Sequence, residues 1–476
     1  MYEKYKMDVG LEVHVELKTR SKIFCACPTD FGSPPNTCVC PVCMGLPGAM
    51  PTLNTEAIEL AIKAGLATGC KIASSTRFDR KNYFYPDLPK AYQISQYEYP
   101  LCFDGGIDIG SKTVGITRIH VEEDAGKLVH DEKRGTLADY NRCGVPLIEI
   151  VSEPDIESAE QAKAYLSELR AILLYAGVSD CKMNEGSFRC DVNLSVRRRG
   201  ESELGVRTEI KNVNSFSFVG KAIEYEFKRQ VEVLESGGKV VCETRRFDEA
   251  TGKTFAMRPK ESAADYRFFP EPDLLPFKVG EERVERIRAT LGKTPAERRK
   301  EYKESYGIGE TDARTITSRP QVAEFFETAA RLTSYPRVAA NVLLGELLTF
   351  AVGDEFDCPL TPMQLADIAQ LFGDKTINSS TVKKLVKLCA ESDLSASELV
   401  ERYDLAQIND EALLARTLDA ALEQNPSLLS DFLGGKTAAE KAIIGKTMAA
   451  TAGKANPVIL GELWNRKKRE LAAGNR

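Results

Sequence analysis

Apolar and polar residues alternate strictly in two segments of the chain, residues 11–17 and 118–124. Side chains of a β-strand point to opposite faces in turn, so the alternation predicts two strands with one buried and one polar face each. The residues expected in the core from the first segment are Leu11, Val13, Val15 and Leu17. The expected polar faces carry Glu12, His14 and Glu16, and then Arg118, His120, Glu122 and Asp124.

Two of the three histidines of the chain lie on these polar faces, each beside carboxylates. A row of carboxylates is unfavourable unless a cation neutralises it. Oxygen ligands of this kind suit magnesium, which usually arrives together with the phosphates of a nucleotide. The pattern therefore predicts a magnesium site that serves a bound nucleotide.

Three further segments pair an apolar face with a polar one: residues 145–151, 187–196 and 207–211. Their chemically active residues are Glu149, Ser187, Arg189, Asp191, Asn193, Ser195, Arg207, Glu209 and Lys211. For a single strand, a solvated outer face is the better explanation. Because the pattern repeats, and because arginines and carboxylates can form bidentate contacts, it favours one shared functional cleft.

Residues 81–90 form a segment dense in aromatic rings, with two prolines and a lysine at each end. The prolines exclude a central strand. Two interpretations fit this composition equally well: a loop that stacks on a base or closes a pocket, and a tyrosine-rich structural corner.

Capping residues and helical periodicity predict helices at about 54–69, 158–177 and 217–236 in an otherwise strand-rich region. From about residue 281 the pattern is helical, at 281–290, 320–333, 336–351, 362–372, 380–391 and 396–406. We expect an α+β domain at residues 1–293, mostly antiparallel, then an all-α domain at 294–407. Short helices broken at Asn425-Pro426, Gly434-Gly435 and Asn456-Pro457 would form a small tail domain at 408–476.

The composition is ordinary for a soluble protein of two to four domains, with 476 residues, 43% apolar and 28% charged. We find no stretch long enough to span a bilayer and no apolar signal core after Met1, which predicts a cytoplasmic protein. Five of the thirteen cysteines fall between residues 25 and 43. Since zinc prefers four thiolates, two close pairs predict a structural zinc site, with buried free thiols as the alternative: Cys25, Cys27, Cys40 and Cys43.

Three Gly-Lys-Thr triplets, at 292–294, 435–437 and 445–447, lack the earlier glycine that a phosphate-binding P-loop requires. A nucleotide would therefore be held on the sheet by magnesium and by basic side chains. The candidates, chosen by charge and strand face, are Arg189, Arg207 and Lys211.

The net charge of −6 argues against a protein devoted to coating nucleic acid, but a local basic surface can still contact it. Lysines of the tail are interleaved with small and apolar residues and can meet phosphates. They are Lys436, Lys441, Lys446 and Lys454. By composition alone a solvated helical face is favoured for these lysines. Trp464 is expected to be a core anchor.

Five segments carry a resemblance to a known family: residues 10–17, 40–48, 118–127, 139–142 and 265–273. Through them, and over essentially the whole chain, the sequence closely resembles the GatB family, the B subunits of aspartyl/glutamyl-tRNA amidotransferases. Glu16 stands where many members carry glutamine. Cys38 stands where many carry glutamine or threonine, which supports leaving it out of the zinc set.

The resemblance implies a cradle domain with a zinc-binding insertion, a helical domain and a tail similar to YqeY proteins. It implies a heterotrimer with an amidase partner (the A subunit), which frees ammonia from glutamine, and with a small C subunit. The GatB subunit would use ATP and magnesium to phosphorylate the side-chain carboxylate of Glu-tRNA(Gln), Asp-tRNA(Asn) or both. Ammonia, arriving through a polar channel, would then displace the phosphate and leave the amide.

Within that mechanism the expected magnesium ligands are Glu12, His14, Glu122 or Glu123, and Glu149. His14 is alternatively the group that positions a coordinated water. Glu12, His14, Glu122 and Glu123 with Arg189 and Lys211 would form the catalytic set, and the ammonia path would be lined by Lys81, Glu123 and Asp191. A non-catalytic tRNA-binding scaffold is disfavoured by the carboxylate rows, and a zinc-dependent hydrolase is disfavoured by a closed set of four thiolates.

Overall fold

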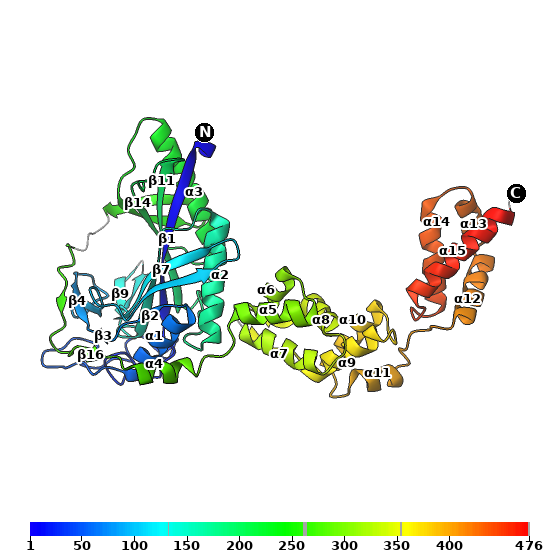
Figure 1. Ribbon diagram of the computed structural model, residues 1–476, viewed down its shortest axis with the longest axis horizontal. Coiled ribbons are helices and arrows are strands. Elements are labelled where there is room, and N and C mark those ends of the chain that lie inside the picture. Colours follow the sequence, from blue (N-terminus) through cyan, green and yellow to red (C-terminus); the bar gives the residue numbers. More distant parts are fainter. Residues whose placement is uncertain (132, 260–263, 353–354, 475–476) are drawn as a thin grey trace. The chain divides into compact units, whose positions relative to one another are not determined.

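The computed structural model describes residues 1–131, 133–259, 264–352 and 355–474. The chain forms two compact units, Met1–Glu297 and Arg298–Arg476 (Figure 1). The first unit combines a large sheet with helices, and the second unit is almost entirely helical. This combination agrees with the predicted α+β class.

A nine-stranded sheet organises the first unit, in the order β14-β13-β12-β11-β1-β10-β7-β6-β2. All neighbouring strands are antiparallel except β12 and β13, so the sheet is mostly antiparallel, as predicted. The strands are β1 (Tyr5–Glu16), β2 (Lys71–Ile72), β6 (Cys102–Asp108), β7 (Thr113–Glu123), β10 (Pro146–Ser152), β11 (Phe188–Arg198), β12 (Thr208–Lys211), β13 (Glu243–Asp248) and β14 (Lys253–Pro259).

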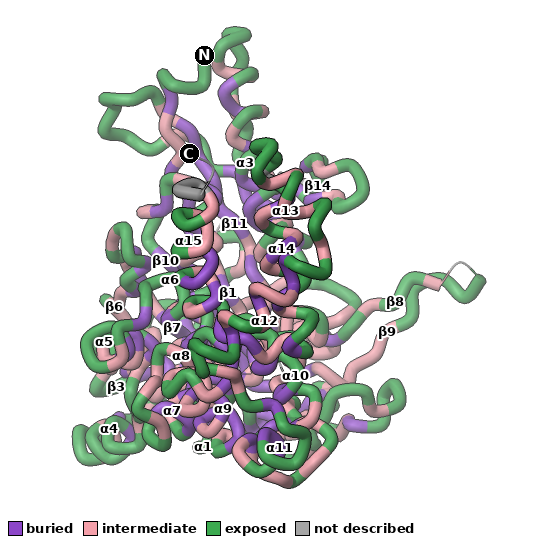
Figure 2. The backbone as a smooth tube through the Cα atoms, turned by 90° about the vertical axis from the view of Figure 1, so that its right-hand side faces the viewer, coloured by how far each residue is buried: buried purple, intermediate pink, exposed green. Residues whose placement is uncertain are grey.

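Three helices pack on one face of this sheet: α1 (Thr55–Ala67), α2 (Ala159–Tyr175) and α3 (Phe216–Glu235). Each helix is capped by a side chain that accepts a hydrogen bond from a backbone N–H of the first turn. The capping residues are Asn54, Ser158 and Ser215 respectively. The apolar positions of β1 are buried in this core, and Figure 2 shows much of the central sheet as buried. The predicted alternation is confirmed, and the even-numbered polar residues of β1 therefore lie on the other face.

Smaller sheets bring distant segments of the first unit together. The prediction that residues 81–90 avoid a central strand is confirmed only in part: Lys81 and Asn82 end β4, the middle strand of a three-stranded sheet, and a loop then leads to β5. Beyond β4, β15 adds a strand from the 265–273 segment, with Phe269 opposite Arg80. The remaining elements of this unit are β3 (Ser75–Thr76), β4 (Asp79–Asn82), β5 (Tyr92–Ser95), β8 (Lys127–Asp131), β9 (Gly135–Asp139), β15 (Phe269–Pro270), β16 (Phe277–Lys278), α4 (Glu281–Arg288) and a short 3-10 turn (Tyr2–Lys4).

The second unit contains two helices that the sequence patterns did not predict, α5 and α6. Helix α5 has no apolar stripe, although the side chain of Tyr302 is fully buried. The helices of this unit are α5 (Pro295–Tyr306), α6 (Glu310–Thr317), α7 (Pro320–Arg331), α8 (Pro336–Val342), α9 (Pro362–Gly373), α10 (Ser379–Ala390), α11 (Ala396–Arg402), α12 (Glu411–Gln424), α13 (Pro426–Leu433), α14 (Thr437–Ala450) and α15 (Pro457–Gly474). Two short strands accompany them, β17 (Ala351–Val352) and β18 (Glu355–Phe356).

The predicted helix at 336–351 is wrong in its second half. Helix α8 ends at Val342, and the chain continues as a π-helical turn, Leu343–Leu347, and a 3-10 turn, Leu348–Phe350. The last four helices begin or end at the predicted breaks and share a core that contains Trp464. Trp464 is 1% exposed and meets the ring of Phe432 edge-on at 5.0 Å, so its expected role as a core anchor is confirmed. Within the described ranges, no helix combines the length and apolar character that a membrane crossing requires.

Candidate functional site

The register of the sheet arranges the polar residues of four strands in rows. In one row His14 of β1 is opposite Glu149 of β10, and Glu149 is in turn opposite His120 of β7. On the other side of β1, Arg189 of β11 is opposite His14. Side chains on directly opposed positions of one face are close neighbours. Residues that are more than 100 positions apart in the sequence therefore meet on one surface.

Two imidazoles and two carboxylates form a compact group at the centre of this surface. His14 Nε2 lies 3.6 Å from Glu122 Oε1 and 3.4 Å from Glu149 Oε2. His120 Nε2 lies 3.5 Å from Glu122 Oε2 and 3.4 Å from Glu149 Oε2. Each histidine thus sits between the same two acids, and all except His14 are almost fully buried.

Opposite charges balance within this group. Burial disfavours the charged imidazole, but the hydrogen bond and charge of Glu149, helped by Glu122, raise the pKa of His14 above its ordinary value. The same contest raises the pKa of His120 to about 9. Burial alone would raise the pKa values of the acids. His120, helped by the charge of Lys81, nevertheless lowers the pKa of Glu122, and both histidines hold the pKa of Glu149 well below its usual range.

A cation fits among three of these side chains. The ligand atoms of His14, Glu122 and Glu149 all lie within 4.8 Å of one another. Two carboxylate oxygens and one imidazole nitrogen are a donor set that a divalent cation accepts. His120 stands behind the two acids and orients them through its Nε2.

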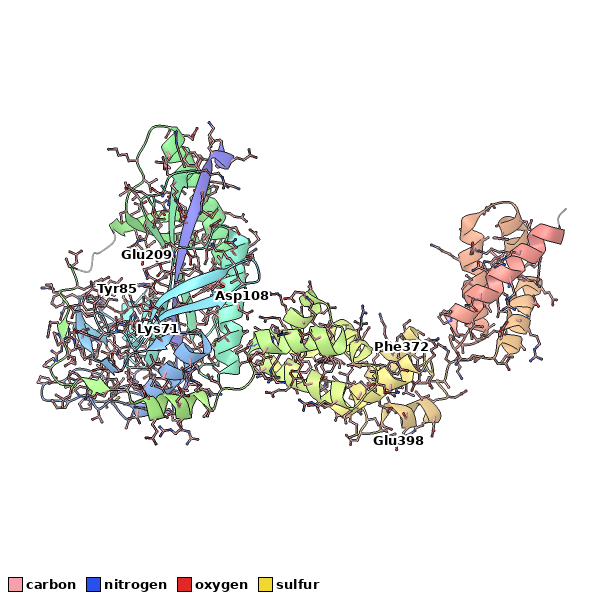
Figure 3. All side chains as sticks on the ribbon, viewed as in Figure 1. Lys71, Tyr85, Asp108, Glu209, Phe372 and Glu398 are labelled. Carbon is pink, nitrogen blue, oxygen red and sulfur yellow. The ribbon has the colours of Figure 1, made fainter. Side chains whose placement is uncertain are left out.

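The structure separates Glu12 from this group. Glu12 joins Asp191 and Glu209 in a second acidic cluster, whose oxygens lie within 4.8 Å of one another (Figure 3 labels Glu209). Asn193 donates a 2.9 Å hydrogen bond to Glu12. The ammonium of Lys211 lies 2.5 Å from Asp191 and 3.4 Å from Glu209, so it neutralises part of the charge of the cluster.

Glu123 lies on the opposite face of β7 from Glu122, because neighbouring residues of a strand point in opposite directions. Its carboxylate pairs with the ammonium of Lys90 and accepts a 2.9 Å hydrogen bond from the backbone of Ile94. It lines a small cavity of about 80 Å³ beside the cysteine loop. The structure therefore does not bring Glu123 to the site of His14.

Two of the three basic side chains expected to hold phosphates are engaged by acids. Arg189 makes a bidentate pair with Asp124, at 3.2 and 2.7 Å, and Lys211 is held as described above. Arg207 is exposed and forms no ion pair with any residue that the structure describes. Of these three basic side chains, only that of Arg207 remains available to bind a phosphate.

Two adjoining cavities open on the polar face, with volumes of about 450 and 390 Å³. Both are lined by His14, Lys81, Tyr83, Asp191 and Lys211. The aromatic segment after β4 thus lines a pocket, which supports the first of its two interpretations. Its next two rings point outward, since Phe84 is 83% and Tyr85 51% exposed (Figure 3 labels Tyr85).

The 265–273 segment completes the wall of the cavity of about 390 Å³. The ring of Tyr266 meets Tyr83 edge-on at 5.9 Å, and the ammonium of Lys81 lies 4.9 Å from the Tyr266 ring centre. Phe268 stacks on Tyr97 with 4.3 Å between ring centres. The sequence patterns did not single out Tyr97, because it lies between the motifs. The wall therefore combines aromatic surface with one lysine.

A buried ion pair anchors this segment to β4. The guanidinium of Arg80 donates to both oxygens of Glu271, at 2.7 and 2.9 Å, and to Asp273 at 3.1 Å. Asn82 adds a 2.8 Å hydrogen bond to the carbonyl of Arg267. Since the side chain of Glu271 is completely buried, its charge depends on Arg80.

Four cysteines converge in the loop after β1. The sulfur atoms of Cys25, Cys27, Cys40 and Cys43 lie within 4.8 Å of one another, a spacing that fits a tetrahedral metal ion. A hydrogen bond from Cys25, with help from the charge of Lys22, lowers the pKa of Cys43 to about 4 despite burial. Lys22 is fully buried, with its Nζ 2.8 Å from the Cys38 carbonyl and 3.6 Å from Cys43 Sγ.

The tail lysines divide into two pairs. Lys436 lies 2.8 Å from Asp431, and Lys454 lies 2.5 Å from Asp404, so acids already neutralise both. Lys441 and Lys446 are exposed on α14, and neither forms an ion pair within the described part of the chain. The second pair is free to meet an anion.

Comparisons with known proteins define the class. Residues 7–285 match the family model described as the GatB/GatE catalytic domain, which includes the whole polar face. Residues 324–467 match the model described as the GatB domain. The first match alone covers more than half of the chain, and the chain belongs to the GatB family.

Curated relatives align with this sequence over nearly their full length. A protein of Caldicellulosiruptor saccharolyticus is 49% identical over 472 residues, covering 97% of this chain and 98% of its own. A protein of Caldanaerobacter subterraneus subsp. tengcongensis is 51% identical over 467 residues, with the same coverage. Both are named as the B subunit of aspartyl/glutamyl-tRNA(Asn/Gln) amidotransferase.

Replacing Glu271 by alanine would leave the guanidinium of Arg80 without its buried partner. Breaking such a pair costs about 3 kcal/mol, which should appear as a lower free energy of unfolding in denaturant titrations. The control is Glu98→Ala, which removes a half-exposed carboxylate 2.6 Å from Arg77 and should cost less than about 1 kcal/mol. Equal losses in the two variants would contradict the anchoring role of Glu271.

Proposed function

We propose that this chain is the B subunit of a glutamine-dependent amidotransferase and phosphorylates the side-chain carboxylate of Glu-tRNA(Gln), Asp-tRNA(Asn) or both with ATP. The shared name of relatives that are 49% and 51% identical over 97% of the chain supports the subunit role. The observation that carries the catalytic part is the group of His14, Glu122 and Glu149 on the polar face, where two cavities adjoin.

The chemistry explains why a charged, polar face is required. A carboxylate has no leaving group, so ammonia cannot displace one of its oxygens directly. Attack of a carboxylate oxygen on the γ-phosphorus of ATP forms an acyl phosphate and releases ADP. Ammonia then attacks the carbonyl carbon, phosphate leaves, and one proton passes from nitrogen to the phosphate to give the amide. When ammonia is withheld, water attacks the acyl phosphate instead, which regenerates the carboxylate and releases phosphate.

The side chains of the polar face have distinct proposed roles. His14, Glu122 and Glu149 would hold magnesium, which neutralises charge on the transferred phosphoryl group. Arg207, just before β12, and Lys211, at the end of β12, would face the phosphates. Glu12, in the second acidic cluster, contributes negative charge beside Lys211 and keeps that ammonium in place.

Ammonia would come from the amidase partner, with a third, small C subunit completing a heterotrimer. Lys81 and Asp191 line both cavities of the polar face, which supports a position where ammonia meets the activated carboxylate. Glu123 would act at a different point, since it lines the small cavity on the other face of β7. The proposed channel therefore has two separate parts within this chain.

Zinc in the four-cysteine group is the second cofactor that we propose. Four thiolates leave no open coordination position, so the metal would stabilise the loop and take no part in the reaction. The buried ammonium of Lys22 offsets part of the negative charge of the thiolates. The backbone next to it also ties this loop to the sheet, because Ile23 donates a hydrogen bond to the carbonyl of Gly144.

Replacing His14 by alanine should remove ATP-dependent activation, because one metal-binding nitrogen and one partner of Glu149 are lost. With the assembled complex, labelled ATP and Glu-tRNA(Gln) but no ammonia source, phosphate release should fall at least about a hundredfold. Glutamine hydrolysis by the amidase partner should persist. His130→Ala, at an exposed histidine of β8, is the matched control and should leave phosphate release unchanged.

The outcomes of this assay separate an enzyme from a scaffold. Release of phosphate that depends on charged tRNA in the unaltered complex supports the proposed reaction. Its absence there would favour a tRNA-binding scaffold. Phosphate release by the His14 variant at the unaltered rate would refute the proposed metal site but not the proposed reaction.

Replacing Cys40 and Cys43 together by serine should abolish zinc binding. The unaltered chain should carry about one equivalent of zinc by elemental analysis, and the double variant close to none. The control is Cys242→Ser, because Cys242 is exposed and lies outside the group. Loss of zinc from both variants would contradict the assignment.

Replacing Lys441 and Lys446 by alanine should weaken tRNA binding more than the same change at Lys436 and Lys454, whose ammonium groups acids already hold. Each lost phosphate contact should reduce the salt slope of the binding constant by about one. Filter binding across a series of salt concentrations measures both effects. Identical tRNA affinities of the two double variants would contradict this role and favour a solvated helical face without tRNA contacts.

A further inference from the structure

Arg118 of β7 has a guanidinium that no side chain of the described residues engages. The side chain is half buried, and its Nε is fully buried without a hydrogen-bond partner within the part of the chain that the structure describes. The other guanidinium groups of the polar face that lie near carboxylates are neutralised, as Asp124 neutralises Arg189 and Arg142. A half-buried cation without a counterion is unfavourable, which points to an anion from outside the chain.

The position of Arg118 limits what this anion is. Arg118 is opposite Val151 of β10, and Val151 is opposite Glu12 of β1, so the guanidinium shares a row with the second acidic cluster. It lines the cavity of about 390 Å³, together with Arg207 and Lys211. Lys81 lines it too, so four cations and the four carboxylates of Glu12, Glu149, Asp191 and Glu209 border this cavity. Asp191 and Glu209 hold Lys211, whereas Lys81, Arg118 and Arg207 form no ion pair with a described residue. These three cations suit an anionic group that carries several charges.

The same cavity has an aromatic side. Tyr97 and Phe268 stack nearly parallel, with an angle of 9° between the rings and 4.3 Å between their centres. Tyr97 remains 44% exposed, so one face of this ring pair is open. A planar aromatic surface beside cations is the combination that binds a nucleobase and its phosphates.

We propose that Arg118 binds a phosphate group of ATP and that the Tyr97–Phe268 pair receives an adenine ring, either of that ATP or of the tRNA. The inference rests on the proposed function, which brings two adenine-bearing molecules to this site, ATP and the 3′-terminal adenosine of tRNA. It adds an arginine and a base platform that the motif patterns did not assign. Both groups contact the ligand directly, one through charge and one through stacking.

The test measures binding of ATP, inorganic tripolyphosphate and adenosine, each with magnesium, to the full complex by calorimetry. Arg118→Met should weaken ATP and tripolyphosphate by a similar factor, about 10- to 100-fold, because a charged hydrogen-bond donor is lost. Its affinity for adenosine should stay unchanged. Arg118→Lys should recover only part of the loss, since lysine lacks the planar fork of arginine.

A separate variant tests the Tyr97–Phe268 pair. Phe268→Leu should weaken adenosine and ATP while tripolyphosphate binds as before, if the adenine comes from ATP. If the adenine belongs to tRNA, ATP affinity is unchanged and the KM for Glu-tRNA(Gln) rises instead. Either result supports the platform and identifies its ligand. Unchanged affinities and an unchanged KM would overturn it.

A matched control distinguishes charge at the cavity from charge elsewhere. Arg199→Met removes a guanidinium that donates to the carbonyl of Glu3, outside the cavity, and all affinities should stay the same. Unaltered binding of ATP and tripolyphosphate by Arg118→Met would overturn the assignment of Arg118. That result leaves the proposed function intact, whereas absence of tRNA-dependent phosphate release from the unaltered complex would refute the function itself.

Discussion

Charge balance on the polar face of the large sheet is the constraint on which the rest of the structure depends. Two buried carboxylates, Glu122 and Glu149, are stable there because two imidazoles lie within 3.6 Å of them. The neighbouring acidic cluster is balanced by Lys211 in the same way. A face this rich in acids folds only with its cations in register, and the helices on the opposite face hold that register by burying the alternate residues of the same strands.

The two cavities extend this arrangement into a site with separate regions. One region holds the group that suits a divalent cation, and another combines unpaired guanidinium with aromatic surface. A third region, the four-cysteine loop, lies near the other face of β7. Cys25 and Cys43 of this loop line the small cavity that Glu123 and Lys90 also line. The chain belongs to the GatB family. The proposed reaction would give these regions a common task, because activation of a carboxylate requires a cation and a phosphate donor, and its amidation requires ammonia.

Much of the fold was predictable from local patterns, and the failures have physical causes. Alternation identified β1 and β7, and capping residues identified α1, α2 and α3 within two residues of their ends. Helix α5 was missed because it has almost no apolar side chains and therefore no stripe to detect. The end of α8 was missed because the π-helical turn after it keeps a helical pattern of apolar residues.

The sequence by itself determined which residues share a strand face, and hence that His14, His120 and their acids were candidates. It also determined the family, since the motifs are long and specific. Only the tertiary structure decided how these candidates divide, because strand order and register set which side chains touch. They place Glu149 between both histidines, move Glu12 to a second cluster and turn Glu123 to the other face. They also leave Arg118 without an acidic partner among the described residues, which no pattern along the chain reveals.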